Sequence, residues 1–505
     1  MNIFVIIVVI IFKFTEGTKI SITQEDDMSY NNELERVSPE SVGISSKVIN
    51  KFIDTINDKK INLHSFMLLR HGKIAAEGYY KPFVKDYKHR IFSVSKSFTS
   101  AAVGIAIDEG LIGLNDRIVD FFPEKLCGNV HEYNGMMTVE HLLKMATSHE
   151  KSTSTEGVDW VKGFLNTEPS HRPGTIFAYD TTGTHTLCAI LQKVTGMTVH
   201  EYLKNRLFGH IGIGEIEWES CPMNINKGGS GIKCTTEDMA RFGQLYLQKG
   251  LWNGLRLITE KWVEQSTSKQ IDNTNTSFML DGKKGYGYKF WRCRNNSYCA
   301  FGMGGQFILV IPEKDAVFVT TANTNLHKDA HQSILDTFWE TIYPDMEDTT
   351  SLGENEPASM ELKEKLSTLM LLLPEGIEIT KNARELSGKK YILDKNRLNF
   401  DYCEFEFSEN TSKLCFTKIE KTFNMYFTFN DYFVAEDPVL GRKAANGGVW
   451  VDEKTLVIIS QLFDIMEMFI ITCHFDAETV VIQIQPGGEL NGENLGCYLN
   501  GTSIK

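Results

Sequence analysis

The stretch SVSKSFTSAAVGIAIDEG, residues Ser93 to Gly110, is the part of the chain that decides the fold. Its apolar residues recur at helical spacing, which predicts a long helix from Ser93 to Glu109 that ends at Gly110. The residues on its apolar side are Phe98, Ala101, Ala102, Ile105 and Ala106. Ser93 and Lys96 are three residues apart, so in the first turn they share one face. A helix with an apolar face therefore begins with a hydroxyl and an amine side by side.

This pair of side chains suits nucleophilic catalysis. A serine hydroxyl is a weak nucleophile until a base removes its proton. The positive potential of a helix N-terminus, together with burial, disfavours a charged ammonium and lowers the pKa of a lysine. We therefore expect Ser93 to be a nucleophile and a neutral Lys96 to be its base. The Ser-x-x-Lys pattern is weak alone, because it also begins at Ser148, Ser230, Ser266 and Ser387. Taken alone, the pattern at Ser93 has an ordinary solvated helix start as its alternative. The long helix with an apolar face that follows Ser93 distinguishes it from the other four sites.

Two further motifs follow along the chain. In PGTIFAYDT, residues 173–181, a Pro-Gly turn leads through an extended piece into a helix and fixes Tyr179 at a loop. A phenol near a lysine can shift toward phenolate and carry a proton, although a plain core tyrosine is the alternative. In GMGGQ, residues 302–306, glycines precede an apolar strand and allow a substrate to lie close to it. A backbone N–H there can serve as an oxyanion donor, although an ordinary turn is the alternative.

Together the three motifs resemble those of the serine β-lactamase/penicillin-binding-protein superfamily, in its class C-like branch of esterases, D-amino-acid peptidases and 6-aminohexanoate-dimer hydrolase. Blocks such as TVEHLLKMATSHE and CTTEDMARFGQLYLQKGLWNG extend the likeness over nearly all of residues 37–345. The resemblance implies that Ser93 forms an acyl-enzyme, that Lys96 is its partner and that Tyr179 is a general base and acid. It also implies an oxyanion hole from the backbone N–H groups of Ser93 and Gln306. The remaining residues that it places at the substrate are Gly304, Gly305 and Thr181.

Two positions depart from the pattern of this superfamily. Thr181 stands where β-lactamases have the asparagine of Tyr-x-Asn, and Met303 stands where a Lys or His is usual. Both changes point away from β-lactamase and D-Ala-D-Ala carboxypeptidase activity. They favour an esterase or amidase that acts on a small-molecule substrate with an uncharged or differently recognised acyl group. The alternatives are a cell-wall D,D-peptidase or weak β-lactamase, and a catalytically silent envelope binding protein.

The chain divides into segments that differ in composition and in hydrophobic pattern. Residues 1–17 contain the apolar run Ile3–Phe12, which is too short for a transmembrane helix and is typical of a signal peptide. Residues 18–36 and 346–372 are polar and acidic, as expected of linkers. Residues 37–345 are predicted to form an α/β domain, in which an antiparallel sheet is flanked by helices and accompanied by an all-helical subdomain. Residues 373–505 alternate apolar and polar residues between turns, which predicts an antiparallel β sandwich or barrel.

The composition of the chain indicates which classes of partner and which cellular compartment to expect. The 505 residues include 52 basic and 65 acidic side chains, and the net charge of −13 disfavours nucleic acid as a partner. Ten cysteines are too few for a disulfide scaffold, although Cys293 and Cys299 bracket a turn and could form one bridge. There is no CxxC or HExxH motif, so we expect no metal and no organic cofactor. With no membrane span expected in the mature chain, the leader predicts a secreted or cell-envelope protein.

Overall fold

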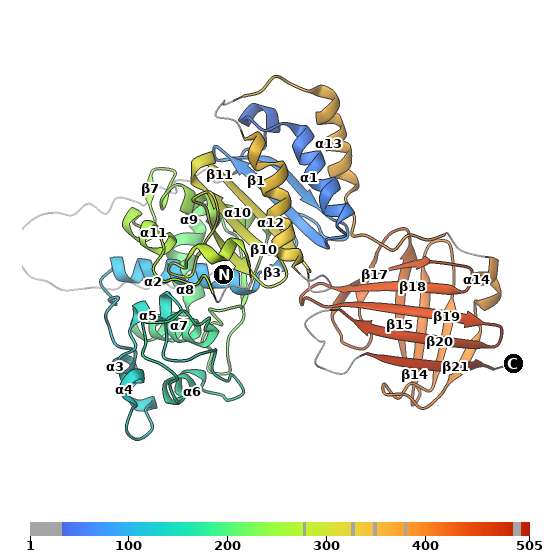
Figure 1. Ribbon diagram of the computed structural model, residues 1–505. Coiled ribbons are helices and arrows are strands. Elements are labelled where there is room, and N and C mark those ends of the chain that lie inside the picture. Colours follow the sequence, from blue (N-terminus) through green and yellow to red (C-terminus); the bar gives the residue numbers. More distant parts are fainter. Residues whose placement is uncertain are drawn as a thin grey trace, which may run out of the picture. The chain divides into compact units, whose positions relative to one another are not determined.

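The computed structural model describes residues 33–275, 279–324, 329–346, 351–377, 381–487 and 496–504. The expected signal peptide, and the expected linker up to residue 32, lie outside the described residues. Within the described ranges, no helix is both long and apolar enough to cross a membrane. Residues 32–505 form one compact unit, in which a six-stranded sheet with its helices is followed by a β-barrel (Figure 1).

Twelve α-helices lie between residues 46 and 341 of the described chain, and two more follow. They are α1 (Ser46–Asp58), α2 (Ser95–Asp108), α3 (Ile118–Phe121), α4 (Glu132–Gly135), α5 (Val139–Leu143), α6 (Trp160–Asn166), α7 (Thr181–Thr195), α8 (Val199–Leu203), α9 (Gly209–Ile211), α10 (Thr236–Leu247), α11 (Glu260–Thr267), α12 (Ala330–Thr341), α13 (Glu356–Thr368) and α14 (Lys381–Leu386). Helix α13 lies inside the segment expected to be a linker and packs on α1, where the Asn50 side-chain amide donates to the Ala358 carbonyl at 3.2 Å. That segment is therefore ordered structure over much of its length.

The six-stranded sheet is antiparallel, in the order β2-β1-β11-β10-β9-β8. Its strands are β1 (Leu63–Arg70), β2 (Lys73–Tyr79), β8 (Trp291–Arg292), β9 (Tyr298–Gly302), β10 (Gln306–Ile311) and β11 (Ala316–Ala322). Short pairings elsewhere use β3 (His89–Arg90), β4 (Glu217–Trp218), β5 (Ile232–Cys234), β6 (Leu251–Trp252) and β7 (Leu255–Arg256). Strand β1 is hydrogen-bonded to β11, so the two ends of the domain meet in the middle of the sheet.

Both faces of this sheet are buried, which explains why β10 reads as an unbroken apolar run. Phe307 and Leu309 of β10 pack into the core on the side of α1 and α12, whereas Ile308 and Val310 pack into the core that contains α2 and α10. Successive residues of a strand point to opposite faces, so both sets must be apolar when helices cover both sides. Figure 1 shows α1, α12 and α13 together beside the sheet.

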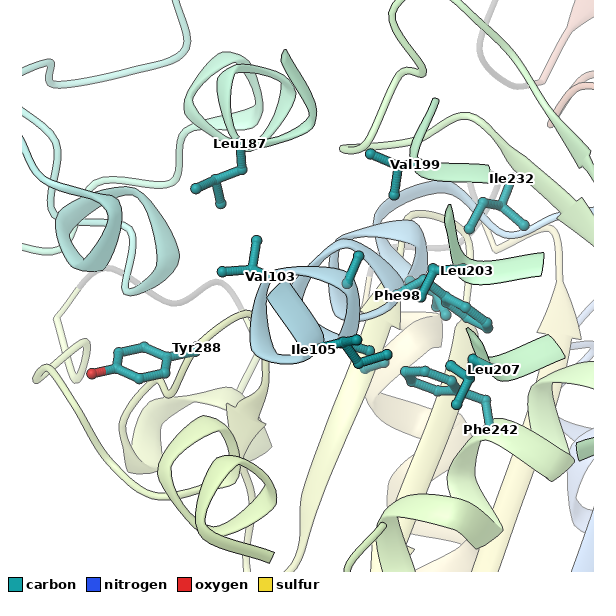
Figure 2. Close-up of a cluster of buried hydrophobic side chains, with 14 of the residues drawn as sticks. Phe98, Val103, Ile105, Leu187, Val199, Leu203, Leu207, Ile232, Phe242 and Tyr288 are labelled. Carbon is teal, nitrogen blue, oxygen red and sulfur yellow. The ribbon is translucent and has the colours of Figure 1, made fainter. Parts of the chain in front are cut away.

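Helix α2 is enclosed by other elements almost along its whole length. Figure 2 shows side chains from several neighbours around it, including Leu187 of α7, Leu203 of α8 and Phe242 of α10. Phe98 of α2 stacks on Phe242 with ring centroids 3.9 Å apart. Gly104 lets Trp262 approach, because a β-carbon there would lie 2.3 Å from the Trp262 ring. The helix is thus a rigid support for whatever its first turn carries.

The C-terminal part is a closed barrel, as the alternating pattern predicted among its two options. The strands are β12 (Lys390–Leu393), β13 (Tyr402–Glu406), β14 (Ser412–Lys418), β15 (Lys421–Phe429), β16 (Phe433–Glu436), β17 (Lys443–Trp450), β18 (Thr455–Leu462), β19 (Met468–Asp476), β20 (Thr479–Pro486) and β21 (Cys497–Ser503). Neighbours are antiparallel, and a parallel pairing of β15 with β17 closes nine strands into a ring, with β16 outside on β17. Gly447 and Gly448 allow this closure, because a β-carbon at Gly448 would lie 2.6 Å from the Phe427 ring.

Candidate active site

Ser93 lies in a short 3-10 turn, Phe92–Val94, directly before α2. The expected α-helix therefore begins two residues later than predicted, at Ser95. The two side chains still meet, because Lys96 Nζ lies 2.9 Å from Ser93 Oγ. A second acceptor holds the amine, since Lys96 Nζ also donates to the Gly229 carbonyl at 2.6 Å. The amine is thus fixed within proton-transfer distance of the hydroxyl.

Burial controls the charge of Lys96. Its side chain is only 1% exposed. Desolvation lowers its pKa from 10.5 to about 7, against the opposing attraction of the Asp180 carboxylate. Removing an ammonium from water disfavours its charged form, so a large share of Lys96 is a neutral amine near pH 7. This is the charge state that a base requires, and it agrees in direction with the expectation from the sequence.

Tyr179 completes the cluster, but with an electrostatic character opposite to the one expected. Its phenol hydrogen-bonds to Ser93, and Lys96 Nζ lies 4.9 Å from the centre of its ring. The Trp291 ring stacks on the Tyr179 ring, with centroids 5.7 Å apart. Burial raises the pKa of Tyr179 well above its usual range, so the expected shift toward phenolate is wrong. Desolvation penalises the phenolate, and the resting side chain is a neutral phenol that can donate a proton.

A small sheet brings Gly229 to the amine. Strand β5 pairs with β3, which comes just before Ser93, and the Ser95 hydroxyl accepts from the Ile232 N–H at 3.1 Å. Gly229 has to be glycine at this spot, since a β-carbon would lie 2.5 Å from Thr181 Cγ2 and 3.3 Å from Lys96 Nζ. None of the three sequence motifs contains this partner of Lys96. Its only sequence signal was the glycine-rich run KGGSG at residues 227–231.

Asp180 and Lys289 are two further buried groups that the motifs did not single out. Asp180 is fully buried and caps α7, where it accepts from the Gly183 N–H at 2.9 Å. Lys289 Nζ donates to the Leu142 carbonyl at 2.5 Å. Burial, reinforced by the nearby Lys96, keeps the pKa of Lys289 well below its usual range. Lys289 is therefore a second buried amine close to Lys96.

The third motif lies against the turn that carries Ser93. A β-carbon on Gly302, the last residue of β9, would lie 2.3 Å from the Ile91 carbonyl oxygen. Gly304 and Gly305 follow with φ of 84° and 93°, a region that favours glycine. The Gln306 side chain is used inside the fold, because its Nε2 donates to the Met303 and Ala322 carbonyls at 3.0 and 2.6 Å. The role of the Gln306 backbone N–H as oxyanion donor stays a prediction.

The cluster of serine, buried lysine and tyrosine can be compared with known proteins. The family model described as Beta-lactamase matches residues 49–336 of the chain.

The chain belongs to the beta-lactamase family.

The relatives of this beta-lactamase-family chain include proteins that are named as hydrolases. It is 27% identical over 289 residues to the 6-aminohexanoate-dimer hydrolase of Paenarthrobacter ureafaciens, which covers 50% of this chain and 71% of that protein. It is 24% identical over 216 residues to a beta-lactamase of Escherichia coli strain K12, covering 36% and 55% respectively. A penicillin-binding protein homolog from Caulobacter crescentus has a similar fold, with a TM-score of 0.50 and 15% identity over 61% of this chain and 99% of that one. The superfamily inferred from the motifs is confirmed, and the chain is a beta-lactamase-family serine hydrolase.

The barrel also contacts the third motif of this family member. The Met466 sulfur lies 3.9 Å from Gln306 Nε2, and a β-carbon on Gly304 would lie 1.7 Å from the same sulfur. Phe463 packs on Phe83 with ring centroids 4.9 Å apart. The segment between β18 and β19 is therefore part of the wall around the glycine turn. Nothing in the sequence pattern pointed to this contact.

Two remaining expectations concern thiols and metals. Cys293 and Cys299 are free thiols, and the Cys293 S–H donates a hydrogen bond to the Cys299 sulfur at 3.4 Å in place of the possible disulfide. Burial, first of all, and the Cys293 thiol keep the pKa of Cys299 well above its usual range. Across the described ranges, no group of three or more His, Cys, Asp or Glu side chains is arranged to hold a metal ion.

Proposed function

We propose that the protein hydrolyses an ester or amide through a covalent acyl-serine intermediate. The observation that carries the proposal is the contact of 2.9 Å between Ser93 Oγ and the nitrogen of Lys96, whose burial lowers its pKa to about 7. Buried groups with strongly shifted pKa values cluster at functional sites, which supports a catalytic part for this amine. The relative named 6-aminohexanoate-dimer hydrolase supports hydrolysis as the reaction class.

The reaction follows from the charge states. The Ser93 proton passes to neutral Lys96 while Oγ forms a bond to the carbonyl carbon, and the carbonyl oxygen becomes an oxyanion. The Tyr179 phenol then gives its proton to the leaving oxygen or nitrogen, and the bond from the carbonyl carbon to the leaving group breaks. The Lys96 ammonium returns a proton to the Tyr179 phenolate. Water then attacks the acyl carbon and gives a proton to neutral Lys96, the bond from that carbon to Ser93 Oγ breaks, and Oγ takes a proton from the Tyr179 phenol, which the Lys96 ammonium restores. An alcohol or amine in place of water would give acyl transfer.

The test of this proposal is active-site labelling with a fluorophosphonate. We expect covalent labelling of the wild-type protein and none of Ser93→Ala, with peptide mapping to Ser93. The control is Ser97→Ala, which removes a hydroxyl of α2 that donates to the Lys289 carbonyl at 2.7 Å. This control protein should label normally. Equal labelling of Ser93→Ala would remove the nucleophile. Absence of labelling and of turnover in the wild type would favour the silent binding protein.

A second candidate, a D,D-peptidase or weak β-lactamase, shares the same acyl-serine chemistry. Thr181 and Met303 weigh against it, because neither supplies the amide or the cation that the superfamily pattern provides. A panel of a short-chain aryl ester, a chromogenic cephalosporin and a D-Ala-D-Ala peptide separates the two. We expect turnover of the aryl ester to dominate, and fast cephalosporin turnover would reverse the choice.

We also propose that the protein is exported. The support is the apolar run Ile3–Phe12 near the start of the chain. N-terminal sequencing of protein recovered outside the cytoplasm should begin near residue 18. Recovery with Met1 intact from the cytoplasm alone would contradict export.

A further inference from the structure

A polar cavity of about 290 Å³ adjoins the Lys96 amine. Gly229, whose carbonyl accepts from Lys96, lines it together with Thr181 at the start of α7. The cavity and the catalytic amine thus share one peptide as a common wall. We call this cavity the Thr181 pocket. The pocket is therefore large enough to admit several groups the size of a water molecule.

The wall of the Thr181 pocket is rich in hydrogen-bond donors. Six hydroxyl side chains line it, with the ring of Trp160, the imidazole of His185 and the ammonium of Lys227. None of the residues that line it is an Asp or a Glu. Hydroxyls, an imidazole and an ammonium can all donate hydrogen bonds, so the wall suits a ligand with acceptor oxygens, and the nearby carboxylates of Asp180 and Glu219 are already engaged by the α7 N-terminus and by Lys227.

Some of these donors have no partner inside the protein. His185 is only 3% exposed, and neither of its ring nitrogens makes a hydrogen bond of normal geometry. Burial lowers the pKa of His185, and the nearby Asn226 backbone opposes part of that shift. The Thr153 hydroxyl is also buried without a partner. Both residues line the pocket, so a bound molecule or an ordered water there lies next to polar groups that the protein itself leaves unpaired.

The backbone adds to the preference for an anion. Helix α7 has 15 residues and begins at Thr181, so its N-terminus faces the pocket, although the Asp180 carboxylate caps that end and offsets part of its positive potential. The loop across from it is fixed, because the Ser152 hydroxyl accepts from the Thr181 N–H at 2.7 Å and the Thr182 hydroxyl donates to the Thr153 carbonyl at 3.2 Å. The pocket is therefore preformed.

Lys227 supplies the charge at this wall. Its nitrogen lies 5.9 Å from the centre of the Trp160 ring and 3.2 Å from the Glu219 carboxylate. Both members of that ion pair are about one-third exposed, at 31% and 34%. Exposed pairs are weak, so a carboxylate inside the pocket can compete with Glu219 for the ammonium.

We propose that the Thr181 pocket binds a free carboxylate of the substrate, so that the preferred substrates are esters or amides that carry a carboxylate a few bonds from the scissile carbonyl. This inference rests on the proposed function and names its substrate class. The methylenes between the two groups would lie along the Trp160 ring. Monoesters and monoamides of aliphatic dicarboxylic acids have this form.

The test compares aryl monoesters of unbranched dicarboxylic acids with the same molecules capped as methyl esters. A second series carries the carboxylate on the aryl leaving group, so that either side of the scissile bond is sampled. We expect kcat/KM to favour the free acid by about 10- to 100-fold in one series, the range of a charge-assisted hydrogen bond. Equal kcat/KM for acid and methyl ester in both series overturns the proposal.

Lys227→Met should abolish this preference while the methyl esters are still hydrolysed. Lys233→Met is the matched control, because Lys233 pairs with Glu217 at 3.5 Å and does not line the pocket. It should keep the preference of the wild type. A preference that survives Lys227→Met places the carboxylate elsewhere and also overturns the proposal.

The outcome for the pocket can be separated from the outcome for the proposed function. Turnover of the methyl esters and fluorophosphonate labelling report on Ser93 regardless of the pocket. Binding of a dicarboxylate product to Ser93→Ala by calorimetry tests the pocket without any turnover. We expect binding that Lys227→Met removes from the Ser93→Ala protein, and no binding to Ser93→Ala counts against the pocket.

Discussion

Replacing Lys96 by methionine should make the protein more stable while it removes the base. Lys96 is buried with a pKa lowered from 10.5 to about 7. Each pKa unit is about 1.4 kcal/mol, so the folded state carries a penalty of about 5 kcal/mol at pH 6 for this one amine. Methionine has a similar length and no charge, so Lys96→Met relieves that penalty.

The substitution also has a cost, which sets the net effect. The Gly229 carbonyl loses the hydrogen bond of 2.6 Å that it accepts from Lys96. A buried acceptor left without a partner costs about 1–3 kcal/mol. The expected net gain at pH 6 is therefore about 2–4 kcal/mol in the free energy of unfolding.

The sign of the pH dependence is fixed by the lowered pKa. Between the folded value of about 7 and the unfolded value of 10.5, the unfolded chain binds more protons at Lys96 than the folded one. Stability of the wild type therefore rises with pH across this window, and the penalty is complete only below it. At pH 9 the penalty has fallen to about 2 kcal/mol, so the advantage of Lys96→Met should shrink to near zero.

The assay is urea unfolding of both proteins at pH 6 and pH 9, with linear extrapolation and a check that the slopes agree. Lys51→Met, on the exposed side of α1, is the control and should change the free energy of unfolding by less than about 0.5 kcal/mol at either pH. A Lys96→Met protein that is less stable than the wild type at pH 6, or whose advantage is equal at both pH values, would refute the buried neutral amine.

Three further outcomes follow from the same geometry. With the Lys96 pKa near 7, kcat/KM for an aryl ester should rise about tenfold from pH 6 to pH 8 in a pH–rate profile, and a flat profile contradicts the lysine base. Tyr179→Phe should lower kcat by about 100-fold or more in steady-state assays with little change in fold, whereas Tyr286→Phe, in the same aromatic cluster, should not. Gly305→Ala forces φ of 93° on an alanine and brings its β-carbon to 2.9 Å from Ile334, so both kcat and the urea midpoint should fall, and wild-type kcat would show that the turn has no catalytic part.

The sheet and the central helix could be predicted because their local pattern and their environment agree. The apolar run FILVI at 307–311 indicates a strand and lies within β10, Gln306–Ile311, and the helical spacing of apolar residues at 236–248 indicates the helix that is found as α10, Thr236–Leu247. The barrel can be predicted in kind but not in detail. The alternating residues 416–429 indicate one strand, yet the chain turns back at Ile419 and Glu420, both at positive φ. Neither residue type is typical of such a turn, so the pattern gave no signal.

Strand β17 shows a second limit of local pattern. Its sequence KAANGGVW has low β propensity, and it was not predicted at all. The glycines are needed because β15 lies parallel and close to it, where the ring closes. A closing contact between segments this far apart is tertiary information, and no spacing within a single strand expresses it.

The active site divides in the same way. Ser93 and Lys96 are near in sequence and share a turn, so their contact was predictable. The Gly229 carbonyl comes from 133 residues away, and the unpaired imidazole of His185 becomes visible only when α7 is placed beside the loop around Thr153. The pKa of Tyr179 was assigned the wrong direction because its sequence shows the neighbouring lysine but not the depth of burial.

Four of the unfavourably buried groups of this domain lie around the Lys96 amine and the Thr181 pocket. Lys96 and Tyr179 are each buried in the charge state that catalysis needs, and His185 and Thr153 lack partners on the wall next to them. Such groups persist only where well-packed surroundings hold them, and α2 provides that support because apolar side chains enclose it. A ligand that satisfies the unpaired groups must then stabilise the folded state, by about 3 kcal/mol at a hundred times its dissociation constant. The same buried polar groups therefore lower the stability of the free protein and contribute to the binding of the substrate.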